Sequence, residues 1–208
     1  MMFRGLVCLL FLLVGAVGSR PMREGGLLDL PAGTTAARKL LQDEIELPTG
    51  YCFSALAFLI SKGADVEASS EETGETPLII AGRIGYLEAV SELIARGAEV
   101  NAKDDTGTTA LILAAAGEGN WFLILALIDA GADVNAQNDL GISALHNAAV
   151  YGHMSSVEPL LSRGADASAV SADGTTPQQA VCSCLIEEED SCNFECKERP
   201  DKIRAALD

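Results

Sequence analysis

The amino-acid sequence predicts an all-α solenoid, in which short helix–turn–helix units stack one on another. A Gly-Ala dipeptide followed by an acidic residue recurs at spacings of 34, 34 and 33 residues, starting at Gly63, Gly97, Gly131 and Gly164. A second marker is a glycine that leads into Thr-Pro or a related pair, and it keeps step with the first from Gly74, Gly107, Gly141 and Gly174. Periods of about 20 to 50 residues are typical of stacked arrays, because one unit alone cannot bury its apolar face.

The clearest unit shows how each pair of helices is expected to begin and end. Thr76 is a suitable N-cap and Pro77 suits the first helical position, so we expect a short helix that runs to about Ile84. Gly85 turns the chain into a second helix, whose apolar residues recur at helical spacing. That helix ends before Gly97, where a left-handed backbone costs a glycine little. A short β-hairpin then connects each unit to the next.

These units resemble ankyrin repeats, whose pattern runs from Gly-x-Thr-Pro-Leu-His through a Gly-His turn to Gly-Ala-Asp-Val-Asn-Ala. The resemblance implies an ankyrin repeat array over residues 34–208, with a degenerate capping repeat at 34–69, three full repeats at 70–102, 103–136 and 137–169, and a Cys-rich C-terminal cap at 170–208. Terminal repeats are expected to be atypical, because one of their faces meets water. The chain departs from the family pattern at Ile79 and Ile112, which replace the usual histidine, and at 114–119, where an extra residue lengthens a turn.

The N-terminus has the features of a secretory signal peptide. Arg4 supplies a positive charge, an apolar run follows, and Ala16 and Gly18 place small side chains at a cleavage site. The run is too short to span a bilayer comfortably, and no later apolar segment is long enough. We therefore expect a signal peptide at 1–18, a flexible arm at 19–33, and a secreted protein without a membrane span after cleavage. An uncleaved signal anchor is the alternative.

Cysteine usage agrees with export, because four of the five cysteines outside this leader lie close together near the C-terminus. Two disulfides are expected among Cys182, Cys184, Cys192 and Cys196. Of the three possible connectivities, we favour Cys184–Cys192 nested inside Cys182–Cys196. A zinc site with four thiolates is the alternative. Cys52 is interpreted as a small buried apolar residue.

Composition and motifs disfavour several classes of function. The formal net charge of −16 opposes a phosphate-binding surface, so we expect no nucleic-acid partner. His146 and His153 occupy repeat positions where a structural role suffices, and no catalytic or phosphate-binding motif accompanies them. Asn101 and Asn135 are expected to satisfy backbone groups of the hairpins. We therefore expect no enzymatic activity, no cofactor and no resident metal.

The resemblance to ankyrin repeats implies a protein-binding groove between the hairpin tips and the exposed face of the inner helices. Carried over by position, the tips contribute Thr73, Glu75, Thr106, Thr108, Leu140, Ile142 and Thr175. The inner helices contribute Arg83, Ile84, Glu118, Val150 and Tyr151. The expected function is that of a secreted, monomeric, non-enzymatic interaction module. Its protein partner is expected to be basic or partly apolar, because the array is acidic.

A convex surface competes with this groove. Trp121, Phe122 and Leu125 belong to a helix that is apolar all round, whereas a surface helix normally carries a polar face. At the positions of Phe122 and Leu125, the neighbouring units hold Glu88 and Ser91, or Ser155 and Glu158. These three residues are the alternative binding patch. Looser packing caused by the extra residue is the other explanation.

Two further functional alternatives stay open. In the first, the Cys-rich C-terminal segment is a metal or redox element that the array only displays. In the second, Arg38 and Leu40 resemble the Arg-x-Leu translocation motif of secreted oomycete effectors, which implies an effector that acts on a host protein. An ordinary amphipathic cap helix is favoured over that motif, because such short matches are common.

Overall fold

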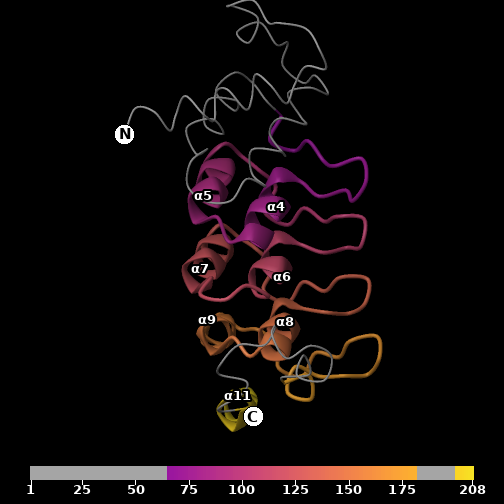
Figure 1. Cartoon of the computed structure of the whole chain (residues 1–208), viewed down its shortest axis with the longest axis vertical. Helices are drawn as coiled ribbons and strands as arrows, with labels where there is room; N and C mark the ends of the chain where they lie inside the picture. Colours follow the sequence, from indigo (N-terminus) through magenta and orange to yellow (C-terminus); the bar gives the residue numbers. More distant parts are fainter. Residues whose placement is uncertain (1–64, 182–199) are drawn as a thin grey trace, which may run out of the picture.

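The computed structural model describes residues 65–181 and 200–208 as an elongated stack of helix pairs (Figure 1). An inner layer contains α4 (Pro77–Ile84), α6 (Ala110–Ala114) and α8 (Ala144–Tyr151). An outer layer contains α5 (Leu87–Ala95), α7 (Trp121–Asp129) and α9 (Met154–Ser162), and α11 (Pro200–Leu207) follows α9 at the C-terminal end. Loops project from the inner layer on the side away from the outer helices. The predicted all-α solenoid is confirmed.

Several predictions lie outside the described residues. They concern the signal peptide at 1–18, the arm at 19–33, most of the capping repeat at 34–69, and the cysteines Cys52, Cys182, Cys184, Cys192 and Cys196. Their interpretations stay predictions. Among the helices of the described ranges, none is long and apolar enough to cross a membrane.

Each inner helix begins at a side-chain cap, as the sequence predicts for Thr76. The hydroxyls of Thr76, Thr109 and Ser143 each accept a hydrogen bond of 3.4 Å from the amide three residues later. These bonds satisfy one of the amides that a helix N-terminus leaves without an intrahelical partner. α4 and α8 end at Gly85 and Gly152, whose φ angles of 80° and 74° lie in the left-handed region. Helices this short depend on stacking for their stability.

The extra residue of the second repeat accompanies a shorter inner helix. α6 ends after Ala114, and residues 115–120 connect it to α7, whereas Gly85 and Tyr86 alone connect α4 to α5. Asn120 donates from Nδ2 to the carbonyl of Ala114 at 3.1 Å and satisfies an acceptor at the end of the short helix. The predicted longer turn is confirmed, and α7 keeps its place between α5 and α9 (Figure 1).

The hydrophobic core lies between the two layers and repeats along the array. At one inner-helix position, Leu78, Leu111 and Leu145 are each 1% exposed. The outer helices bury Val90, Ile124 and Val157 at one position and Leu93, Leu127 and Leu160 at another. A fully buried side chain of this size contributes about 1.5 to 3 kcal/mol relative to an exposed one. All nine side chains belong to one cluster, so the repeats stabilise one another.

The connections between repeats are tight loops, and the described part of the chain contains no β-strand. In the second loop, Gly107 donates to the carbonyl of Asp104, and Asp104 donates to the carbonyl of Thr108, both at 3.0 Å. An isolated antiparallel bridge pairs Gln137 with Ser143 in the next loop. The predicted hairpins therefore close at their tips, but their arms are too short to pair as strands.

Asparagine side chains join each repeat to the next. Asn101 donates to the carbonyl of Gly131 at 3.0 Å and accepts from the amide of Asp133 at 2.8 Å. Asn135 makes the same pair of bonds one repeat later, at 3.2 and 2.8 Å. Each side chain satisfies one carbonyl and one amide that would otherwise depend on water. The predicted structural role is confirmed, and the groups that are satisfied belong to the neighbouring repeat.

The C-terminal end departs from the repeat pattern. The Thr176 hydroxyl accepts from the amide of Gln179 at 3.4 Å, and the Thr176 amide donates to Gln179 Oε1 at 3.0 Å. This reciprocal pair is the arrangement of a capping box. Further along, α11 packs against α9 and adds Ile203 and Leu207 to the common core. The array therefore has apolar contacts at this end beyond its third full repeat.

Candidate functional site

The loop tips form one continuous edge along the array. The carbonyls of Thr73, Thr106 and Leu140 accept hydrogen bonds from the following tips, donated by the amides of Asp105, Asp139 and Ala172 at 3.1, 3.0 and 2.8 Å. Because each tip is bonded to the next, their side chains keep a fixed spacing. This edge runs beside the inner helices, so tips and inner helices border the same side of the molecule (Figure 1).

The third tip illustrates how each loop is held internally. Asn138 Oδ1 accepts from the amide of Leu140 at 3.0 Å and from the amide of Ile142 at 2.9 Å. The contact between tips is also close, because a Cβ added to Gly107 would lie 2.6 Å from Asp139 Oδ1. Gly107 has a φ of 75°, so only glycine fits both the backbone conformation and the space. The tips are therefore bonded both internally and to one another.

His146 links the third repeat to the C-terminal cap. Its Nδ1 accepts from the amide of Ser143 at 3.2 Å, and its Nε2 lies 3.1 Å from the carbonyl of Thr175. These partners require the neutral tautomer that carries its proton on Nε2. Burial lowers the pKa of His146, while the Thr175 carbonyl and the charge of Asp173 act in the opposite direction. These bonds give His146 the structural role that the sequence predicts.

His153 has a similar role between the second and third repeats. It is buried, and its Nε2 lies 3.0 Å from the carbonyl of Ala116 in the lengthened turn. Each histidine thus contacts a backbone carbonyl of an adjacent repeat. His146 Nδ1 also lies 2.9 Å from the hydroxyl of Ser143, which is buried and caps α8.

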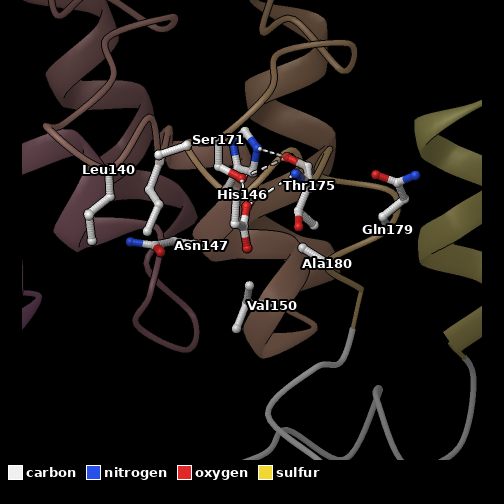
Figure 2. A pocket seen from close by; sticks show the side chains of 11 residues that line it. Leu140, His146, Asn147, Val150, Ser171, Thr175, Gln179 and Ala180 are labelled. Carbon is white, nitrogen blue, oxygen red and sulfur yellow. Dashed lines mark hydrogen bonds between the residues drawn. The ribbon is translucent and has the colours of Figure 1, made fainter.

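A pocket of about 480 Å³ opens between the third repeat and the cap. Its apolar lining includes Leu140 on the tip, Val150 on α8 and Ala180 in the cap (Figure 2). Ile142 on the same tip also lines the pocket. The other lining residues are His146, Asn147, Ser171, Ala172, Asp173, Thr175 and Gln179. Pockets of this size, with apolar walls and a few polar groups, are typical binding sites.

Asp173 places a negative charge at the rim of this pocket. The Ser171 hydroxyl donates to its carboxylate, and the amide of Thr175 donates to it at 3.1 Å. These bonds, with Ser171 as the larger cause, lower the pKa of the exposed Asp173. The carboxylate is therefore ionised at neutral pH, next to an apolar surface.

The structure brings four predicted groove residues together, because Leu140, Ile142, Val150 and Thr175 all line the pocket. Other predicted residues lie at least partly exposed outside it: Thr73, Ile84, Thr106, Glu118 and Tyr151. Arg83 and Glu75 form an ion pair with each other at 3.1 Å. Their charges are therefore partly neutralised before a partner arrives. The binding role of all these residues stays a prediction.

Thr108 corrects the predicted surface. The residue is only 5% exposed, and its hydroxyl lies 2.8 Å from Thr106 Oγ1. The same hydroxyl accepts from Asn138 Nδ2 at 3.3 Å. Thr108 therefore stabilises the contact between two tips instead of facing a partner.

Apart from Thr175, the polar lining of the pocket was not expected from the sequence. The repeat pattern could have predicted Asp173, because it stands one repeat after Leu140 and so belongs to a tip. The pattern could not have predicted Asn147. Its place depends on a contact between repeats, in which its Nδ2 donates to the carbonyl of Ile112 at 2.9 Å. Within the described residues, no group of three or more His, Cys, Asp or Glu is arranged to hold a metal.

The alternative convex patch lies on the outer layer. Trp121 is 38% exposed and Phe122 is 58% exposed, and Leu125 is partly exposed. The predicted apolar surface is therefore present on α7. Its role in binding stays a prediction.

Comparison with known families agrees with this architecture. A family model described as ankyrin repeats in three copies matches residues 49–138, and one described as the ankyrin repeat matches residues 140–172. Together the two matches cover more than half of the 208 residues. No curated protein matches the sequence. The phased markers, the stacked helix pairs and both matches agree, and the chain belongs to the ankyrin repeat family.

Proposed function

We propose that the chain binds a basic, partly apolar segment of a protein partner in the groove between loop tips and inner helices. Ankyrin repeat arrays serve as protein–protein interaction modules, generally without enzymatic activity. The observation that carries the proposal is the pocket, where Leu140 and Ile142 from a tip meet Val150 from an inner helix. Apolar side chains that insert into such pockets commonly supply most of the binding energy.

The charge of the groove favours a basic partner. Exposed carboxylates lie on successive tips, at Glu71, Glu72, Asp105, Asp139 and Asp173. Of the nearby basic groups, Arg83 pairs with Glu75, and Lys103 donates to the carbonyl of Gln137 at 3.3 Å and keeps its charge. A lysine or arginine beside the inserted side chain would meet Asp173 at the rim. Such complementarity raises the association rate and the specificity more than the affinity.

The test compares two matched arginine substitutions. Leu140 and Val170 are 61% and 52% exposed, and only Leu140 lines the pocket. We expect Leu140→Arg to weaken binding of a partner captured from extracellular fluid by about tenfold or more. Val170→Arg should leave the affinity unchanged, and both variants should keep the wild-type melting temperature. Equal binding by the two variants would remove the groove from the proposal.

We also propose that the chain is exported and carries two disulfides. The support is the signal-like sequence at 1–18 and the four clustered cysteines, Cys182, Cys184, Cys192 and Cys196. Mass spectrometry should show Ser19 as the mature N-terminus. Alkylation should modify the four cysteines only after reduction. An intact Met1 in the extracellular fraction would contradict cleavage, and four thiols that react without reduction would contradict the disulfides.

A further inference from the structure

The outer face of α7 exposes apolar side chains where the neighbouring helices are polar. Phe122 is 58% exposed and Trp121 is 38% exposed, and Leu125 follows one turn later. The corresponding positions of Phe122 and Leu125 are Glu88 and Ser91 on α5, and Ser155 and Glu158 on α9. A contiguous apolar patch with a polar border is typical of an interaction site.

The core does not require these side chains. α7 already buries Leu123, Ile124 and Leu127 against the inner layer, each at most 2% exposed. The same inward positions suffice in α5, where Ala89, Val90 and Leu93 are fully buried and the outer face stays polar. The apolar outer face of α7 therefore adds little to packing between the layers, and it leaves large side chains in contact with water.

Trp121 and Phe122 form a stacked aromatic pair on this face, with 28° between the ring planes. Aromatic side chains have few rotatable bonds, and rings that already stack lose little further freedom on binding. The exposed ring faces also suit a guanidinium or ammonium group. The pair is therefore a suitable anchor for a partner that combines apolar and cationic side chains.

The charges around the patch are negative on both sides. Glu88 on α5 and Glu158 on α9 are exposed, and neither forms an ion pair with any described residue. Other acidic groups of the outer layer are neutralised, since Glu92 pairs with Arg96 at 2.8 Å and Asp129 pairs with Arg163. Two unneutralised carboxylates thus flank the apolar stripe.

These charges select among the possible occupants. A second copy would bring Glu88 and Glu158 close to the same carboxylates, and an anionic membrane would repel them. A cationic partner would be attracted on both sides of the stripe. Ser91 on α5 and Ser155 on α9 are exposed and carry small side chains, which suits the close approach of a packed helix.

We propose that the outer face of α7 binds an amphipathic helix of a protein partner, with an apolar stripe bordered by lysine or arginine. The apolar stripe covers Trp121, Phe122 and Leu125, and the basic residues face Glu88 and Glu158. This surface belongs to the outer layer, whereas the pocket is lined by residues of the third tip, α8 and the cap. The outer helices and the loop tips lie on opposite sides of the inner helices (Figure 1). The two surfaces are therefore independent, and one molecule binds two partners at once.

Trp121 supplies a direct readout, because it is the chain's only tryptophan. The probe is a synthetic helical peptide with leucine at positions i, i+3, i+4 and i+7 and lysine elsewhere. Titration of the full chain with this peptide should shift the Trp121 emission to shorter wavelength, and the shift gives a dissociation constant. The same peptide with glutamate in place of lysine should bind at least about tenfold more weakly.

The main variant is Phe122→Glu with Leu125→Ser, which installs the residues that α5 carries at these positions. It should keep the helical circular dichroism and the melting temperature, and it should weaken peptide binding at least about tenfold. Glu88→Gln with Glu158→Gln should weaken binding and reduce its dependence on salt. Leu140→Arg, which alters the groove, should leave this binding unchanged.

Several results would overturn the proposal. One is an unchanged affinity in a folded Phe122→Glu, Leu125→Ser protein, and another is equal binding of the lysine and glutamate peptides. A wild-type dimer that becomes monomeric in this variant would assign the patch to a second copy. Trp121-dependent binding to phosphatidylserine vesicles would assign it to a membrane. None of these results would bear on the pocket at Leu140, which its own arginine variants test.

Discussion

At Ser156 the array buries a hydroxyl group that has no hydrogen-bond partner among the described residues. Ser156 is fully buried in α9, at the position that Ala89 holds in α5. Burying a hydroxyl without a partner costs roughly 1 to 3 kcal/mol. We expect Ser156→Ala to raise the free energy of unfolding by about 1 kcal/mol, measured by urea denaturation. Ser155→Ala, at the exposed neighbouring position, should change it by less than about 0.5 kcal/mol. A less stable Ser156→Ala protein would mean that the hydroxyl finds a partner in solution.

His146 should make the third repeat sensitive to mild acid. Its folded pKa is lowered from 6.5 by burial, so near this pH the unfolded chain binds more protons than the folded one. The contribution of neutral His146 to the free energy of unfolding is therefore fully present above about pH 7. It falls as the pH drops through 6.5 towards the lowered folded pKa. The charge of Asp173 and the Thr175 carbonyl limit this fall. Thermal melts at several pH values measure it.

The chain offers a control for the histidine. Gln179 stands one repeat after His146 and makes the same capping bond, to the amide of Thr176 at 3.0 Å. His146→Gln should keep the capping hydrogen bond. Its free energy of unfolding should not fall between pH 7 and pH 6. Asp166 and Asp173 do not titrate there, because hydrogen bonds lower their pKa below the usual 3.8. An identical pH profile in the glutamine variant would show that other groups cause the effect.

Single residues also show which structural features could be predicted from the sequence and which could not. Thr76 and Gly85 were predictable, because caps and left-handed turns depend on the residue itself and its immediate neighbours. The burial of Thr108 was not, because its hydroxyl is covered by the next tip and bonds to Asn138. Asn147 escaped prediction for the same reason, since its partner is the carbonyl of Ile112. Local signals specify the repeat, while contacts between repeats decide which side chains remain available.

Among the elements, α9 carries a proline in its interior. Pro159 has no amide to donate to the preceding turn, and at this position α5 has Glu92 and α7 has Ala126. An interior proline costs a helix about 3 kcal/mol relative to alanine, and the proline's restriction of the unfolded chain offsets part of this cost. We expect Pro159→Ala to raise the free energy of unfolding by about 1 to 2 kcal/mol.

The reciprocal change in α7 is the matched control for this prediction. Ala126→Pro should destabilise the array by about 3 kcal/mol, because it removes an intact backbone hydrogen bond at the same helical position. Chemical denaturation of both variants gives the two values. A stability loss in Pro159→Ala would indicate that the ring of Pro159 makes packing contacts worth more than the missing bond.

The element pattern shows why the fold was predictable and the site only partly so. Helices α4 and α8 follow from two markers that recur in phase, and one extra residue indicated the longer turn after α6. The pocket forms where a tip of the third repeat meets the irregular cap, so its shape depends on residues that follow no repeat pattern. The exposed face of α7 was predictable, because Phe122 and Leu125 break a pattern that both neighbouring helices keep.

At the scale of the whole molecule, α11 should determine whether the array remains soluble. Ile203 and Leu207 are 1% and 7% exposed and belong to the core shared with α9. Ile203→Ala should lower the free energy of unfolding by about 2 to 4 kcal/mol, and removing residues 200–208 should also cause self-association. Arg204→Ala, on the exposed side of α11, is the control and should change little. Thermal melts and light scattering measure both effects, and a truncated chain that stays monomeric with an unchanged melting temperature would contradict them.

The bonds of Asn101 and Asn135 reach only backbone atoms of the following loop, namely one carbonyl and one amide. Backbone atoms are the same in every loop, so these bridges do not depend on which repeat comes next. An in-frame duplication of residues 103–136 would therefore place each asparagine opposite a matching carbonyl and amide. The bridges also tolerate a longer turn within a repeat, because Asn101 lies 30 residues before Gly131 whereas Asn135 lies 29 residues before Gly164. A gene for such an array can therefore grow by duplication of whole repeats without new side chains at the junction.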